Sequence, residues 1–230
     1  MTTKRIVLFI TENRNVTAAI SAALSKLYGK EKYHVEFISF SLESAIRKLS
    51  DSTDISPEIS NCINSYLLKN KGIYTARDIE EIIHLIDLNG SHVTIDKIRN
   101  LSPELQRDDY VDLPRINAFK KPAIDALVKI KHIRVSIPYK PYYFSRNIAH
   151  VFVNKPMAIL DMKTSEIIDS VYGNNSISFV EFINNIECIA PGNYDETWEF
   201  IKQGINSYER YTNFHLLVNS TPFAQTYNTP

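Results

Sequence analysis

Apolar and polar positions divide the first fifty residues into four short elements. Residues 5–10 form a continuous apolar run, which is typical of a buried strand. Residues 16–27 then repeat apolar side chains at helical spacing, and Gly29 follows as a helix terminator. Residues 34–40 alternate between apolar and polar and predict a second strand, followed by a short helix over 42–49. This order predicts a β-α-β-α unit with parallel strands and a right-handed crossover.

Helical spacing dominates the chain from there to residue 110. Three further helices are predicted, over 59–68, 75–88 and 93–105. The composition changes near residue 110, which indicates an N-terminal α/β domain over 1–110 and a second region over 111–230.

The second region mixes both types of element. A helix is predicted over 122–130 and a strand over 132–137, and Pro138 and Pro141 bracket a predicted tyrosine-rich turn. A short strand is predicted over 157–160, and later helices over 178–186 and 196–208. The predicted fold class is therefore α/β, in which the N-terminal β-α-β-α unit is followed by a mixed α+β basic region and a helical acidic tail.

The neutral net charge hides a strong asymmetry within this second region. Between Leu113 and Lys155 there are nine basic residues and one acid, whereas nine acids and three bases follow Pro156. A basic segment of this kind indicates a polyanion or an acidic protein surface as partner. Aromatic residues in the same segment could stack on bases, so nucleic acid is a candidate partner. The predicted nucleic-acid-binding residues are Lys129, Lys131, Arg134, Lys140 and Arg146.

Several other classes of site lack their sequence signatures. No glycine-rich phosphate loop occurs, and no histidine pair or cysteine pair has metal-ligand spacing, so no cofactor or metal site is predicted. The two isolated cysteines indicate free thiols in a reducing compartment, and no apolar run is long enough to span a membrane. We therefore expect an intracellular protein, cytoplasmic or nuclear, or a virion component if the source is viral.

Glu12 is the one candidate catalytic residue, because it directly follows the first predicted strand. Ligands of parallel α/β sheets bind outside the carboxyl ends of the strands. The segment Leu-Phe-Ile-Thr-Glu12 and the following helix resemble the opening of the Toprim domain of type IA topoisomerases. That resemblance implies that Glu12 acts with a downstream Asp-x-Asp pair on magnesium. This chain has no such pair, and Asp87-Leu88-Asn89 is the nearest approach. The alternative is that Glu12 caps the following helix or is solvated.

A second resemblance begins at Leu113-Pro114-Arg115-Ile116. It continues through Lys121-Pro122, the lysine-rich stretch 128–136 and Tyr-Tyr-Phe-Ser-Arg146. This order resembles the C-terminal assembly domain of the fifth-subunit family of DNA-dependent RNA polymerases, which is found in archaea and, in divergent form, in large DNA viruses.

The family resemblance implies a noncatalytic subunit of a multisubunit polymerase, with no catalytic site of its own. Leu113, Pro114, Arg115 and Ile116 would contact the larger protein subunits, and the basic residues would face a partner or the nucleic-acid path. Lys121 stands where the family has an aspartate. Three alternatives stay open: a metal-dependent nucleic-acid enzyme using Glu12, a helix-hairpin-helix DNA glycosylase suggested by Phe144-Ser-Arg146, and a small protein-interaction adaptor.

Overall fold

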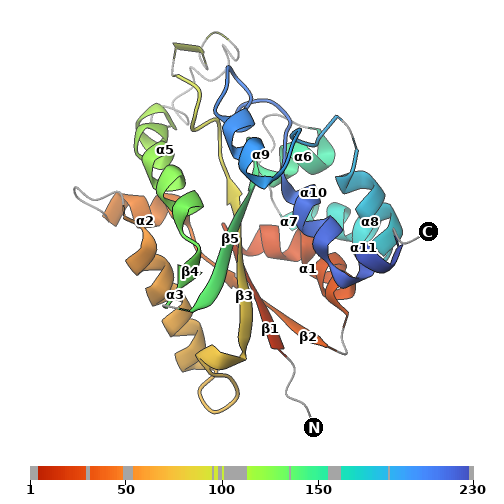
Figure 1. Cartoon of the computed structure of the whole chain (residues 1–230). Coiled ribbons are helices and arrows are strands. Elements are labelled where there is room, and N and C mark those ends of the chain that lie inside the picture. The colour runs from red at the N-terminus through yellow and green to blue at the C-terminus, as the bar shows by residue number, and fades with distance from the viewer. Residues whose placement is uncertain are drawn as a thin grey trace.

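The fold is a five-stranded sheet with helices on both faces (Figure 1). The computed structural model describes residues 5–29, 32–48, 54–94, 96–97, 100, 113–134, 136–154, 162–185 and 187–227. The strands are β1 (Arg5–Thr11), β2 (Tyr33–Ser39), β3 (Ile79–Asp87), β4 (His132–Ile133) and β5 (Ile137–Phe144). Their order is β2-β1-β3-β5-β4; all neighbours are parallel except the short β4, which pairs antiparallel with β5. The predicted α/β fold class is confirmed.

Each face of the sheet has its own helical layer and its own core (Figure 1). One layer consists of α2 (Leu42–Lys48), α3 (Ser56–Lys69), α5 (Leu113–Lys129) and α9 (Tyr194–Ile201). The other consists of α1 (Arg14–Tyr28), α6 (Ile148–Val153), α7 (Met162–Ile168), the π-helix η4 (Asp169–Gly173), α8 (Ser176–Ile183), α10 (Phe214–Ser220) and α11 (Pro222–Tyr227). In β1, Leu8 belongs to the first core and Phe9 to the second. Burial on both faces is the reason that β1 is a continuous apolar run.

The chain winds in opposite directions from the centre of the sheet. From β1 it moves outward to β2, and it then returns across β1 to β3 on the other side. The sheet therefore has a topological switch point between β1 and β3, at their carboxyl ends. Such points are the usual ligand sites of open α/β sheets.

The predicted N-terminal unit is confirmed by β1, α1, β2 and α2. The predicted helix over 75–88 is wrong: a single 3₁₀ turn, η1 (Ala76–Asp78), leads directly into β3. Apolar residues of β3 happen to recur at helical spacing, but nearly all of the strand is buried between the two helical layers. Short apolar runs cannot be assigned by periodicity alone, and tertiary burial decided this one.

The predicted tyrosine-rich turn is also wrong, because these residues form β5. In β5, the N–H groups of Tyr139 and Tyr143 point away from β3, to Lys131 O at 2.9 Å and Asn213 Oδ1 at 2.8 Å. Pro141 lies between them in the same alternation, so its missing N–H removes no bond to β3. The predicted strand over 132–137 is shortened to β4 by the turn that precedes β5.

The predicted domain boundary near residue 110 lies outside the described residues. Strands from both sides of it pair directly, with Ile82–Asp87 of β3 beside Tyr139–Phe144 of β5, so one sheet continues across it. The predicted strand over 157–160 and most of the predicted helix over 93–105 also lie outside the described residues. Among the helices that are described, none has both the length and the apolar character that crossing a membrane requires.

Candidate active site

Polar residues gather at the carboxyl ends of the three central strands, the upper edge of the sheet in Figure 1. Glu12 follows β1, Asp87 ends β3, and Ser145 and Arg146 follow β5. Because these strands are parallel and adjacent, their ends meet at one edge, which includes the switch point. Helix α5 contributes Lys120 to the same edge, since its Nζ donates to Asp87 O at 2.5 Å.

Glu12 is held by α2 and keeps one oxygen free of hydrogen bonds. Its Oε2 accepts from Leu42 N at 3.2 Å, while Oε1 is buried without a hydrogen-bond partner. Burial raises the pKa of this carboxyl, and the Lys120 charge opposes that rise. Helix α1 is capped instead by Asn13, whose Oδ1 accepts from the N–H groups of Asn15 and Val16. The alternative that Glu12 caps the following helix is therefore wrong.

Asp87 is the second carboxyl at this edge. Its Oδ1 accepts from Ile148 N, the first residue of α6, at 3.1 Å. Burial and then the charge of Glu12 raise its pKa, while Lys120 and the bond from Ile148 N lower it, and together they give a pKa of about 7. The two carboxyls thus interact electrostatically, and Asp87 exchanges its proton near neutral pH. As whole residues, Glu12 and Asp87 are partly buried.

Lys120 is the buried cation of the cluster, with an exposed fraction of 3%. Its Nζ donates to Asp87 O and also, at 3.1 Å, to Asn89 Oδ1. The second bond belongs to the orientation of the Asn89 amide in which Nδ2 donates to Arg146 O. The sequence interpretation counted Lys120 only as part of the basic segment. The sequence feature that could have identified Lys120 is its position, because it lies at helical spacing from Ile124 and Leu127, on the apolar face of α5.

Several other buried polar atoms near this edge have no partner. His84 is fully buried; its Nδ1 is 2.6 Å from the Tyr139 hydroxyl, and its Nε2 is unpartnered. Burial, and then the Lys120 charge, lowers the pKa of His84 to about 3. Asn117 and Ser91 also have an unpartnered buried oxygen each. Folded proteins normally pair such groups, so their concentration here indicates a site for water or a ligand.

The free oxygens suit a hard divalent cation. Carboxylate oxygens of Glu12 and Asp87 and the amide oxygen of Asn117 are the ligand type that Mg²⁺ prefers. Within the described residues, no three His, Cys, Asp or Glu side chains form a metal-binding group. A cation here would therefore be held by two carboxylates, with amide, water or substrate oxygens completing its shell. That is the usual manner of Mg²⁺ binding at phosphate-processing sites.

The other predicted site residues lie elsewhere. Leu113, Pro114, Arg115 and Ile116 form the first turn of α5, and their side chains are outside what the structure describes. Lys129, Lys131 and Arg134 are exposed at the opposite end of α5 and just before β5. Lys140 lies in the middle of β5, with its Nζ 4.3 Å from the centre of the Tyr194 ring.

Arg146 departs from the prediction of a common basic face. Its exposed fraction is 8%, and its guanidinium lies 4.0 Å from the centre of the Tyr208 ring. It follows β5 at the carboxyl edge, away from the other four residues.

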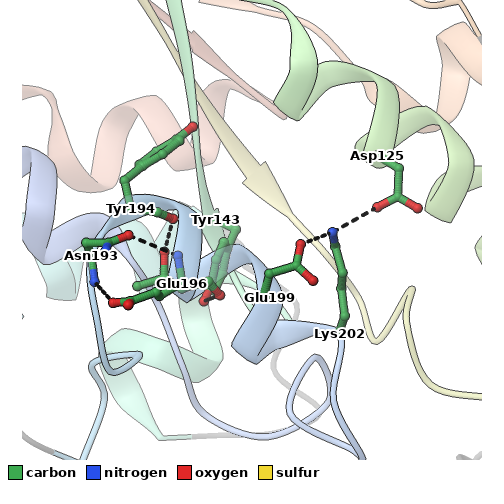
Figure 2. Close-up of polar contacts among 8 residues, drawn as sticks. Asp125, Tyr143, Asn193, Tyr194, Glu196, Glu199 and Lys202 are labelled. Atoms are coloured by element: carbon green, nitrogen blue, oxygen red, sulfur yellow. Dashed lines mark hydrogen bonds and ion pairs between the residues drawn. The ribbon is translucent and has the colours of Figure 1, made fainter.

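A second polar cluster, around α9, has a different character (Figure 2). The Tyr143 hydroxyl donates to Thr197 O at 2.9 Å, and Asn193 and Glu196 form a capping box at the start of the helix. Lys202 bridges Glu199 at 2.6 Å and Asp125 at 3.9 Å. These groups bind one another across α5, β5 and α9, which indicates a structural role.

Comparison with known proteins adds no relative on which to base an assignment: no family model, curated protein or solved structure matches the chain.

Proposed function

We propose that this chain is a divalent-cation-dependent enzyme that processes nucleic acid, with Glu12 and Asp87 as its acidic pair. One observation carries the proposal: two interacting carboxyls, one with a free oxygen, end adjacent central strands at the switch point of the sheet, beside a buried lysine. This develops the Toprim-like alternative, because Asp87 follows a strand and not a helix. The exposed lysines and arginine at the other end of α5 support a polyanionic substrate.

The side chains suit chemistry at a phosphodiester. A cation bound by the two carboxylates would stabilise charge on the phosphate oxygens. Asp87 is fixed through Ile148 N and presents its carboxyl beside Glu12. Lys120 lowers the pKa of both carboxyls, which favours the ionised forms that a cation requires.

The test is nucleic-acid processing with and without a divalent cation. Wild-type protein is incubated with end-labelled single- and double-stranded DNA and RNA in Mg²⁺, in Mn²⁺ and in EDTA. We expect cation-dependent cleavage or strand transfer, which Glu12→Gln and Asp87→Asn each reduce by about 100-fold or more.

Glu166→Gln is the matched control, because Glu166 is an exposed carboxylate on α7. It should retain the wild-type rate. Unchanged activity in Glu12→Gln, full activity in EDTA, or no processing of any of these substrates would overturn the proposal.

We propose an intracellular location on the basis of Cys62 and Cys188, which are both free thiols.

A second candidate is the noncatalytic polymerase subunit. It is supported by the exposed basic residues at the end of α5, the helix that begins with Leu-Pro-Arg-Ile. It predicts that large polymerase subunits co-purify in stoichiometric amount with the tagged protein from its native source. The triple variant Lys129→Glu, Lys131→Glu, Arg134→Glu should abolish that recovery; co-purification of every partner with this variant would contradict the assignment.

A further inference from the structure

We propose that the corner of the sheet formed by the end of α5 and the β4–β5 turn binds the phosphate backbone of a nucleic acid whose other part occupies the carboxylate edge. This inference rests on the proposed function and deepens it, because it makes the substrate an extended polymer. The name basic corner is used here for Lys129, Lys131 and Arg134.

The basic corner carries three exposed cations. None of the ion pairs found among the described residues includes any of the three. Lys131 is close enough to Lys140 to act on its charge, with Glu81 and Asp195 as the opposing acids. Lys129, Lys131 and Arg134 therefore keep their charge available for a partner. Unpaired lysines and arginines facing solvent are the side chains that replace counterions on a phosphate backbone.

Nucleic acid is favoured over an acidic protein because α5 connects the basic corner with the proposed active edge. The helix carries Lys120 at the carboxylates and Lys129 at its last residue. Lys120 itself is buried and faces the carboxylates, so a strand or duplex would span the length of α5 with one part at Lys129 and its reacting part at the carboxylate edge. An acidic protein would bind the basic corner alone, and its binding would have no connection with the carboxylate edge.

The geometry sets a minimum length for such a substrate. Nine residues of helix separate Lys120 from Lys129, which is about 14 Å. Seven residues of β5 separate Ile137, beside β4, from Phe144, beside Asp87, which is about 23 Å. At about 3.4 Å per base pair, these spans correspond to about four to seven base pairs. A shorter duplex cannot reach both sites.

The test measures binding separately from turnover. Affinities of the Glu12→Gln protein are measured for hairpin-closed duplexes of about 3, 12 and 24 base pairs over a range of salt concentrations. We expect a steep gain in affinity between the shortest duplex and the other two. Adding Lys129→Glu, Lys131→Glu and Arg134→Glu should remove that gain and reduce the slope of log K against log salt by about 3.

A charge-matched control separates position from net charge. Lys32→Glu, Lys48→Glu and Lys163→Glu change three exposed lysines on other parts of the molecule and should preserve the gain with length. The proposal is overturned if the basic-corner variant keeps the gain, or if both triple variants lose it equally. It is also overturned if polyglutamate, and not DNA or RNA, binds in a manner that depends on the basic corner.

The length dependence of binding is tested independently of the catalytic role of Glu12. If Glu12→Gln retains full processing activity while the length dependence holds, the catalytic assignment fails and the basic corner stands. If Glu12→Gln abolishes activity but affinity does not depend on length, the reverse conclusion follows.

Discussion

Two polar regions flank β5, and they differ in how completely their groups are paired. In the interior cluster around Asn213, Tyr143 N donates to Asn213 Oδ1 at 2.8 Å, Asn213 Nδ2 donates to Thr197 Oγ1 at 3.2 Å, and the Thr212 hydroxyl donates to Tyr143 O at 2.5 Å. At the carboxylate edge, by contrast, Glu12 Oε1 and the oxygen of Asn117 have no partner.

This difference distinguishes polar groups that stabilise the fold from polar groups that are available to a ligand. A buried polar network stabilises a fold when its members satisfy one another, and it is costly when they do not. The Asn213 cluster joins β5 to α9 and to the start of α10, and its bonds are made within the chain. The carboxylate edge holds two carboxyls with raised pKa, together with unpartnered acceptors on Glu12 and Asn117. Substitutions in the two regions should therefore have opposite effects on stability.

The largest expected difference is between Asn213→Ala and Asp87→Asn. Asn213→Ala leaves the buried Tyr143 N without a partner and removes the bond that Thr197 Oγ1 accepts, although the Thr197 hydroxyl still donates to Tyr194 O. We therefore expect the free energy of unfolding to fall by about 1–3 kcal/mol. Asp87→Asn removes a carboxylate that is unfavourable when ionised and keeps an acceptor for Ile148 N, so the protein should become more stable at pH 8. Urea denaturation measures both changes.

Asn61→Ala serves as the control for these measurements, since Asn61 is an exposed residue of α3 and its loss should change stability by less than about 0.5 kcal/mol. A destabilised Asp87→Asn protein would show that the carboxylate edge is structural after all.

The pH dependence of unfolding sharpens the comparison further. The pKa of Asp87 is about 7 in the folded chain, against 3.8 ordinarily. Between about pH 4 and pH 7, the native state therefore binds one proton more at this residue than the unfolded chain does. The contribution of Asp87 to the free energy of unfolding is therefore present below about pH 4. It is lost as the pH rises towards 7, with a slope of up to about 1.4 kcal/mol per pH unit.

The buried histidines act in the opposite direction. The pKa of His84 is lowered to about 3 and that of His92 to about 4, mainly by burial, so their contribution is lost as the pH falls below about 6.5. The stability of wild type minus that of Asp87→Asn should thus decline from about pH 4 to pH 7 and then level off. A difference that does not change with pH would mean that Asp87 has an ordinary pKa.

The smallest expected effect compares two equivalent helix caps. Asn193 caps α9 in the paired region, and Asn13 caps α1 directly after Glu12. Replacing either asparagine by alanine should lower the free energy of unfolding by about 1 kcal/mol. Only Asn13→Ala should also lower the rate of nucleic-acid processing, because it loosens the turn that carries Glu12. Equal rates in the two variants, measured at a temperature where both are folded, would contradict this.

Sequence patterns predicted those elements in which one interpretation of the spacing was available. The apolar run of β1 and the helical repeat of α1 each fit a single type of element, and both are confirmed. In β3 the apolar residues fit helical spacing as well, and the proline pair in β5 imitates a turn. Pairing between parallel strands that are distant in the chain leaves no local pattern, so these two strands were missed.

In the candidate site, too, some residues could be identified from local sequence and others only from the fold. Glu12 could be identified because its position after a strand is a local property. Asp87 was noted only as part of the nearest approach to an Asp-x-Asp pair, because its value as a strand-end residue depended on β3 being a strand. Lys120 resembled the other lysines of the basic segment until α5 brought it to Asp87.

The sequence by itself determined the local elements of the N-terminal unit, the separation of basic and acidic charge, and the candidacy of Glu12, since each depends on neighbouring residues alone. Only the tertiary structure decided that Glu12, Asp87 and Lys120 meet at one edge while the basic corner lies at the other end of α5. The physical reason is that burial and long-range strand pairing set both the positions and the pKa values of these groups.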